Sequence, residues 1–218
     1  MTTLYKHVKY HEWLNNVFNH MINQTYTQIQ NEEINKIDPD LLDDFFGLIT
    51  RYFRYLPEVV LRSPSLETQL KLGVKTIGVT TSNAARALYQ FHEEVFMQLD
   101  PSNQNKNIEV LARLIAGGYG AVTVNKMIEV LWKKYPDRKL IDFMDDVFKQ
   151  ILLHVREVSI NWWVAALMDV PQQILNNGEK ASFVENLKTK SYKENEDYYK
   201  DFFEKFYKRC RTYSSKLF

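Results

Sequence analysis

Apolar residues recur three and four positions apart along almost the whole chain, which is the period of an amphipathic helix. The alternating pattern of a strand is hard to find. The helical pattern is widest in one stretch, where the apolar positions are Leu41, Leu42, Phe45, Phe46, Leu48, Ile49, Tyr52, Phe53 and Leu56. So broad an apolar face indicates a helix that packs against neighbours on two sides. The pattern therefore predicts an all-α fold.

Helix-start signals recur at a regular distance. They fall near Pro39, Ser82, Thr123 and Ser159, at a spacing of about 40 residues with two helical patterns in each interval. Two helices per period of this size are typical of HEAT or armadillo-type repeats, which stack because one pair cannot bury its apolar faces alone. We expect a single α-α superhelix (a HEAT/armadillo-like solenoid) over residues 1–218, with about four to five helical-pair repeats. Its parts are a leading helix and four repeat-like units, at residues 1–30, 39–80, 81–118, 119–155 and 159–213.

Composition narrows the class of protein. The 218 residues carry 28 basic residues against 27 acidic ones, so the net charge of +1 gives no field that favours nucleic acid or anionic lipid. Cys210 is the single cysteine, which excludes an internal disulfide and fits a reducing compartment. The first residues lack the apolar core of a signal peptide, and no apolar run reaches membrane-spanning length. We expect an intracellular, soluble protein with no membrane partner.

No catalytic arrangement can be proposed from the sequence. His7 and His11 have the four-residue spacing of metal ligands on one helix face, but no acidic or cysteine ligand lies at a fitting third position. The glycine-rich stretch from Ala116 to Lys126 lacks the spacing of a phosphate-binding loop and has helical patterns on both sides, so we interpret it as a tight turn between helices. We expect no enzyme, no cofactor and no metal. A metal-dependent hydrolase would depend on His7 and His11 alone.

Trp162 is the first candidate for contact with a partner. In the helix around it, the residues expected to face the core are Ile160, Trp163, Val164, Leu167 and Met168. Because Trp163 holds the core spacing, its neighbour Trp162 points elsewhere, and an exposed tryptophan is typical of an interface anchor. The alternative is that Trp162 packs on the segment near Val170 and Pro171.

Cations off the apolar stripes are the next candidates, for an acidic partner. Two of them, Lys71 and Lys75, share one helix, and a second group on the last helix comprises Lys205, Lys208, Arg209 and Arg211. The alternative for the lysine pair is a solvated helix face. For the terminal group, one alternative is a favourable interaction with the negative end of the helix dipole, and another is a contact with nucleic acid.

Four segments of the chain carry a resemblance to a known family. The segment IDPDLLDDFFGLITRYFRYLPEVVLRSP combines an acid-Phe-Phe helix, a proline break and a serine before a second proline. It is followed by AVTVNKMIEVLWKKYPDRKLIDFMDDVF, INWWVAALMDVP and DYYKDFFEKFYKRCR. In this order the segments resemble the carboxy-terminal part of transportin-SR-type karyopherins, HEAT-repeat nuclear transport receptors of the importin-beta superfamily. The resemblance extends from Thr25 to Arg211.

The resemblance implies the carboxy-terminal cargo-binding arch of a nuclear transport receptor. Such an arch holds protein cargo, and not nucleic acid, on a concave surface, in the cytoplasm and the nucleus. The amino-terminal repeats that bind Ran-GTP in the family have no counterpart here, so we expect Ran-GTP to act only through upstream repeats absent from this chain. The arginine-rich helix with which some members grip phosphorylated serine-arginine cargo has no counterpart before Asp40. The chain is then a fragment of a receptor or a divergent short protein, and the alternative function is a HEAT-repeat scaffold or adaptor without a transport role.

Overall fold

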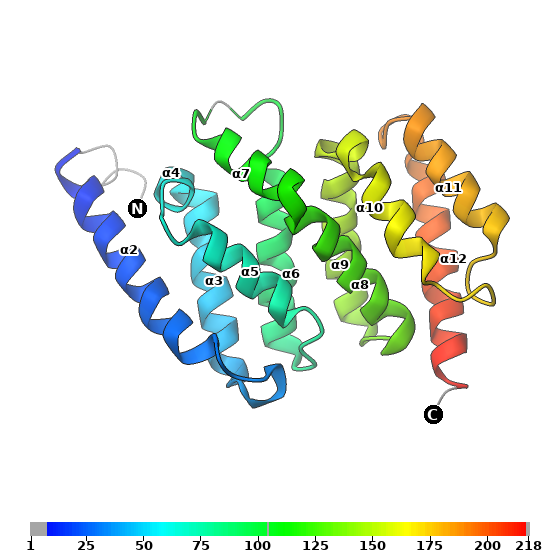
Figure 1. The fold of residues 1–218 in the computed structure, drawn as a ribbon, viewed down its shortest axis with the longest axis horizontal. Coiled ribbons are helices and arrows are strands. Elements are labelled where there is room, and N and C mark those ends of the chain that lie inside the picture. The colour runs from blue at the N-terminus through cyan, green and yellow to red at the C-terminus, as the bar shows by residue number, and fades with distance from the viewer. Residues whose placement is uncertain (1–7, 104, 217–218) are drawn as a thin grey trace. The chain divides into compact units, whose positions relative to one another are not determined.

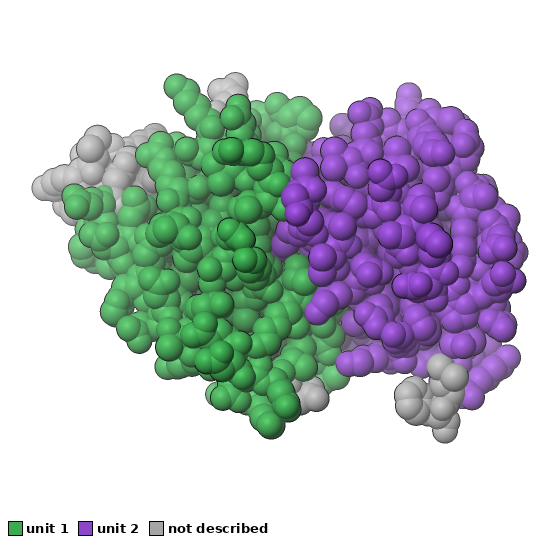
Figure 2. Space-filling view, in the orientation of Figure 1, with its two compact units in different colours: residues 1–114 green, residues 115–218 purple. Residues whose placement is uncertain are grey.

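The computed structural model describes residues 8–103 and 105–216, and these residues form helices and no strands (Figure 1). The helices in chain order are α2 (Val8–Ile29), η1 (Ile34–Lys36), α3 (Pro39–Tyr55), α4 (Pro57–Leu61), α5 (Leu66–Thr76), α6 (Ser82–Met97), α7 (Ile108–Leu114), η2 (Ile115–Tyr119), α8 (Gly120–Lys133), α9 (Arg138–His154), α10 (Arg156–Met168), α11 (Asn177–Thr189) and α12 (Glu196–Ser214). The all-α fold class is confirmed, and the packing of successive helices is that of α-α repeats. The chain consists of two compact units, residues 1–114 and residues 115–218 (Figure 2).

The first unit is built around α3, whose start follows the sequence signal. The Asp38 carboxylate accepts a hydrogen bond from the Asp40 backbone N–H at 3.0 Å, and Pro39 occupies the first turn, where its missing N–H costs nothing. Pro57 then ends α3 and begins α4. The wide apolar stripe is buried, as expected, at Leu42, Phe45, Phe46, Ile49, Tyr52 and Phe53.

Helix α3 packs most extensively against α6. The Phe46 ring lies 5.2 Å from that of Phe91, and eight residues further along α3 the side chain of Arg54 pairs with Glu94. Because the contacts advance together along both helices, α3 and α6 run in the same direction. This is the relation between the first helices of two successive repeat units, and α3 and α6 lie side by side (Figure 1).

The glycine-rich stretch forms a kink. Residues Ile115–Tyr119 are π-helical, and Gly118 departs from helical geometry with a φ of 137°, a value that glycine adopts without strain. Along the chain α7 is followed directly by η2 and α8, without a connecting loop.

An aromatic core fills the second unit. The rings of Phe148 and Phe203 stack with centroids 5.3 Å apart, and Trp163 contacts Phe183 edge to face at 5.4 Å. The stripe expected on the last helix is buried at Tyr199, Phe202, Phe203, Phe206 and Cys210. The Cys210 thiol is free, and burial raises its pKa, which makes it inert. Within the described ranges, no helix is long and apolar enough to cross a membrane.

Candidate functional site

Trp162 is not an exposed anchor. Its side chain is buried, with 8% of its surface exposed, and its indole lies against the backbone of Gly120 on α8. The alternative, that Trp162 packs on the segment near Val170 and Pro171, stays a prediction. The inward stripe expected on α10 is also wrong at two positions. Val164 and Met168 face solvent, and Met168 is 74% exposed. The exposure that a partner-binding role of Trp162 requires is absent.

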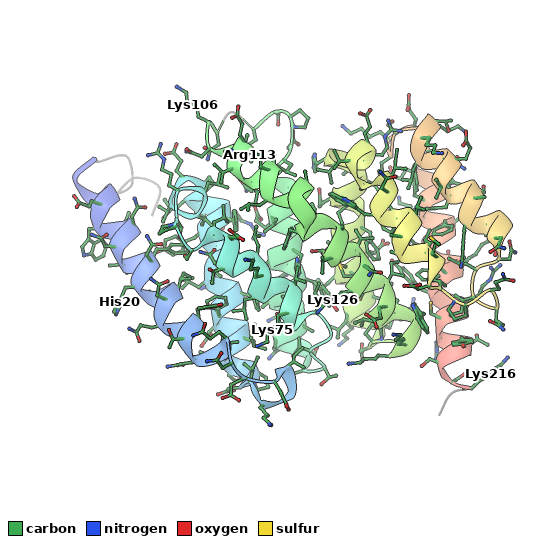
Figure 3. All side chains as sticks on the ribbon, in the orientation of Figure 1. His20, Lys75, Lys106, Arg113, Lys126 and Lys216 are labelled. Atoms are coloured by element: carbon green, nitrogen blue, oxygen red, sulfur yellow. The ribbon has the colours of Figure 1, made fainter. Side chains whose placement is uncertain are left out.

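The two lysines of α5 have different surroundings. Lys75 donates hydrogen bonds from its Nζ to the carbonyl oxygens of Gln30 and Glu32, both at 2.8 Å, in the segment after α2 (Figure 3). The Ile29 carbonyl oxygen, at the last residue of α2, lies 3.4 Å from the same Nζ, so Lys75 caps the C-terminal end of α2 and the turn that follows it. Lys71 is 73% exposed and forms an ion pair with Glu67 one turn away at 2.7 Å. Lys75 is therefore structural, and Lys71 belongs to a solvated face.

The four cations of α12 also separate into two kinds. Arg209 donates to the Ile174 carbonyl oxygen at 3.1 Å and to the Glu179 carboxylate at 2.6 Å, which ties α12 to the start of α11. Lys205 pairs with Asp201 one turn away at 2.6 Å. Lys208 and Arg211 are exposed, and neither has an acidic partner within 4 Å among the described side chains. They are the cations of this cluster that are available to a partner.

Lys208 and Arg211 line a groove of about 340 Å³ between α9 and α12. Arg138, at the start of α9, lines the same groove and is likewise exposed without an ion pair in the described part of the chain. Tyr135 lies beside these cations, and its pKa is raised by burial while Arg211 and Arg138 oppose the shift. Arg138 and Arg211 thus lie near Tyr135, and Lys208 lines the same groove. We call Arg138, Lys208 and Arg211 the cationic end of the α9–α12 groove.

The backbone at Tyr135 is strained. Its φ of 37° lies in the left-handed region, which is unusual for a residue with a side chain, and Pro136 restricts it further because a residue before proline avoids the ordinary helical conformation. Strain of this kind costs about 1–3 kcal/mol and persists where the surroundings hold it in place. This backbone conformation places the side chain of Tyr135 at the cationic end of the groove.

A hydrogen bond joins α9 and α12 elsewhere in this groove. The Tyr207 hydroxyl donates to the Asp145 carboxylate at 2.9 Å. Burial raises the pKa of Asp145, and the hydrogen bond from Tyr207 opposes that shift. Asp145 is held in place by this bond but remains an acidic group of the groove, and Asp142 and Glu204 line it as well, so the lining carries both basic and acidic side chains.

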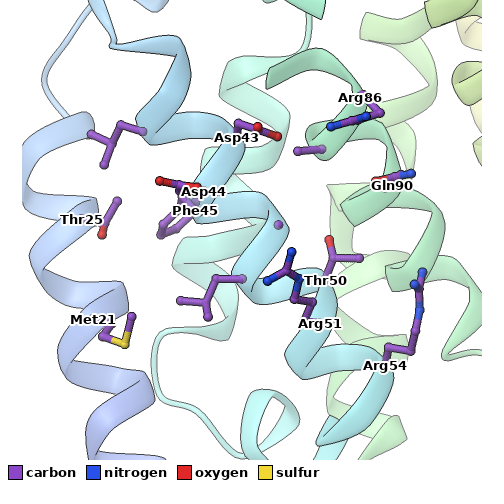
Figure 4. Close-up of a pocket in the computed structure, with 14 residues that line it drawn as sticks. Met21, Thr25, Asp43, Asp44, Phe45, Thr50, Arg51, Arg54, Arg86 and Gln90 are labelled. Carbon is purple, nitrogen blue, oxygen red and sulfur yellow. The ribbon is translucent and has the colours of Figure 1, made fainter. Parts of the chain in front are cut away.

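A larger groove of about 530 Å³ lies over α3 in the first unit (Figure 4). Its lining comes from α2, α3 and α6, and includes Arg51, Arg54, Arg86 and Gln90. Sequence reasoning missed this site because no single helix contains it. The signal that could have pointed to it is the glycine at Gly47, in the middle of the strongest helical pattern of the chain.

The possible metal ligands give no site in the described residues. His7 lies outside them, as does the side chain of His11, so the proposed pair is not tested. Among the described residues, no group of three histidine, cysteine or acidic side chains is arranged to hold a metal ion.

Comparison with known proteins does not assign the chain to a family. No protein-family model matches it, and no curated protein matches it. The resemblance to transportin-SR-type karyopherins therefore stays a prediction from the four sequence segments.

Proposed function

We propose that the chain is a helical-repeat binding module that holds an acidic segment of a protein partner in the α9–α12 groove. One observation carries the proposal. Arg138, Lys208 and Arg211 come from two helices, line one groove and have no acidic partner among the described residues. Guanidinium groups bind carboxylates through two parallel hydrogen bonds, and a groove that excludes part of the water strengthens that attraction.

The wider role that we propose is cargo binding in a nuclear transport receptor. Its support is the order of the four sequence segments, and the all-α repeat fold is compatible with it. In this role the partner is a protein cargo, Ran-GTP acts through repeats upstream of this chain, and the protein works in the cytoplasm and the nucleus. The module itself holds cargo and carries out no chemistry.

Site-specific cross-linking tests the binding site. A photoreactive residue placed at Glu204, which lines the groove, should cross-link to an acidic segment of a defined partner in cells. The same residue at Glu185, exposed on α11 outside this groove, is the control position. The double substitution Arg138→Glu and Arg211→Glu should abolish the product from position 204. Identical products from both positions, or a product that survives the charge reversal, would show that the groove does not bind the partner.

The transport role has a separate readout. The partner identified by cross-linking should lose its nuclear accumulation in cells that carry only the charge-reversed protein. If cross-linking is lost but the nuclear distribution of the partner does not change, the protein is a binding scaffold and has no transport role.

A further inference from the structure

The groove over α3 in the first unit has two kinds of lining. Its apolar part includes Met21, Leu41 and Leu48, and Met21 is 43% exposed despite its size. Its polar part includes Arg86 and Gln90 of α6, which project from the side opposite Met21 (Figure 4). A groove of this composition offers an apolar contact and charged hydrogen-bond donors to the same ligand.

Gly47 forms part of this groove and is not required by the fold. A Cβ built at this position would have nothing within 4 Å, so no neighbouring helix needs the space. Its backbone is ordinary helix, since the glycines with positive φ in the described residues are Gly78 and Gly118. A glycine inside a helix costs about 0.5–1 kcal/mol relative to alanine. The open space above Gly47 is therefore a feature of the groove and allows a ligand to approach the α3 backbone.

The arginines of the groove are not equivalent. Arg54 is held by the buried carboxylate of Glu94, with its Nη2 at 3.1 Å and its Nε at 3.2 Å from the same oxygen. Arg51 and Arg86 are exposed and have no acidic partner within 4 Å in the described part of the chain. The charge of Arg54 is compensated inside the unit, whereas Arg51 and Arg86 are available to a ligand.

Two acidic residues restrict what the groove accepts. Asp43 and Asp44 line it near the start of α3, and Arg51 lies seven to eight residues further along, which is about 11–12 Å at the helical rise. A run of acidic residues along the whole groove would meet these carboxylates, and like charges held close together cost binding energy. The ligand that fits has a carboxylate at Arg51 and uncharged or apolar groups elsewhere.

We propose that the α3 groove is a second protein-binding site, which takes a partner segment with a large apolar side chain next to a carboxylate. The apolar side chain lies over Gly47 against Met21 and Leu48, and Arg51 receives the carboxylate. The α9–α12 groove also has apolar lining residues, among them Ile141 and Phe203, so the two grooves differ in the helices that form them and in the open space above Gly47. The inference stands on the first unit alone and does not depend on the proposed function.

Peptide selection tests the inference without a known partner. A phage-displayed library of random 12-residue peptides is panned on the full chain and counter-selected on the variant Gly47→Trp, whose indole fills the space above α3. We expect the enriched peptides to pair leucine, phenylalanine or methionine with an adjacent aspartate or glutamate. Enrichment of uniformly acidic peptides, or no enrichment above the counter-selected background, overturns the proposal.

Binding of the enriched peptides is then measured by fluorescence anisotropy with purified variants. Gly47→Trp should weaken binding at least about tenfold, and so should Arg51→Glu, because it removes a charge-assisted hydrogen bond. Gly47→Ala and Lys106→Glu are the matched controls: the first keeps most of the space, and the second reverses an exposed charge on the loop before α7 (Figure 3). Both should change the affinity less than about twofold.

A third substitution keeps the test decisive if the tryptophan variant fails to fold. Met21→Glu removes the exposed apolar contact from α2, where the side chain is already partly in solvent. It should weaken the same peptides while the thermal unfolding midpoint stays within a few degrees of the original. Peptides that bind all three variants as tightly as the unaltered chain are bound elsewhere, and the groove is then not a binding site.

Discussion

The backbone of Gly120 on α8 lies directly against the six-membered ring of the Trp162 indole on α10. A methyl group at position 120 would overlap three atoms of that ring. The contact explains why Trp162 is buried, and it makes a small residue at 120 a condition for the close approach of the two helices.

Replacement of Gly120 by alanine should therefore destabilise the second unit. The overlap forces either the indole or α8 to move, and overpacking of this kind costs about 1–3 kcal/mol in the free energy of unfolding. The measurement is urea unfolding followed by tryptophan fluorescence. Gly47→Ala serves as the control, since its methyl enters open space and should stabilise the chain by about 0.5–1 kcal/mol. Equal midpoints for the two variants would contradict the close packing of Gly120 against Trp162.

Most helices of the fold were predictable from sequence. Which residues of a helix face the core was not always predictable. Helix α3 has one wide stripe and a clear start at Pro39, and both were correct. Helix α10 is apolar nearly all round, so periodicity alone does not say which residues face inward. The side that packs is decided by Gly120, about forty positions earlier in the chain, and this is why Trp162 is buried while Met168 is exposed.

The candidate sites were predictable only in part for a related reason. Lys208 and Arg211 were identified as cations off the stripe, whereas Arg138 joins them only after α9 and α12 pack together. Lys75 and Arg209 had the same appearance in sequence, yet their bonds to carbonyl oxygens 35 to 46 positions away make them structural. A sequence shows that a lysine is off the stripe, but not which helix end it reaches.

The two lysines of α5 provide a direct test of this distinction. Lys75→Met removes the donor that satisfies carbonyl oxygens after α2 and should lower the free energy of unfolding by about 1–2 kcal/mol. Lys71→Met breaks an exposed ion pair within one helix and should change it by less than about 0.5 kcal/mol. Chemical denaturation of both variants gives the comparison. If Lys71→Met proves the more costly, Lys75 does not act as a cap.

Arg209 and Arg211 form a second matched pair, in which stability and binding should separate. Arg209→Met leaves the Glu179 carboxylate and the Ile174 carbonyl oxygen without their shared donor, and should cost about 1–3 kcal/mol of stability. Arg211→Met should leave stability nearly unchanged and weaken binding of an acidic partner. Thermal unfolding and the cross-linking yield from position 204 measure the two effects. If Arg209→Met abolishes cross-linking while the chain remains fully folded, Arg209 is part of the binding site.

His92 should make the first unit sensitive to mild acid. The ring is fully buried on α6, and burial lowers its pKa to about 3, against an opposing hydrogen bond with the Gly73 backbone. Because the folded-state pKa lies below the unfolded value of 6.5, the unfolded chain binds the proton first. The stabilisation is fully present above pH 6.5 and is lost progressively as the pH falls below that value. From pH 7.5 to 5.5 we expect the free energy of unfolding to fall by about 1 kcal/mol.

The substitution His92→Gln isolates this contribution. Glutamine keeps a polar group beside Gly73 but does not titrate, so the variant should be less stable than the original chain at pH 7.5 and lose little further stability at pH 5.5. The exposed His20 provides the control, and His20→Gln should preserve the full loss. Denaturant unfolding at the two pH values measures both, above the range where most carboxylates titrate. If His92→Gln and the original chain lose the same stability on acidification, the proton is taken up elsewhere and the buried ring does not control the response.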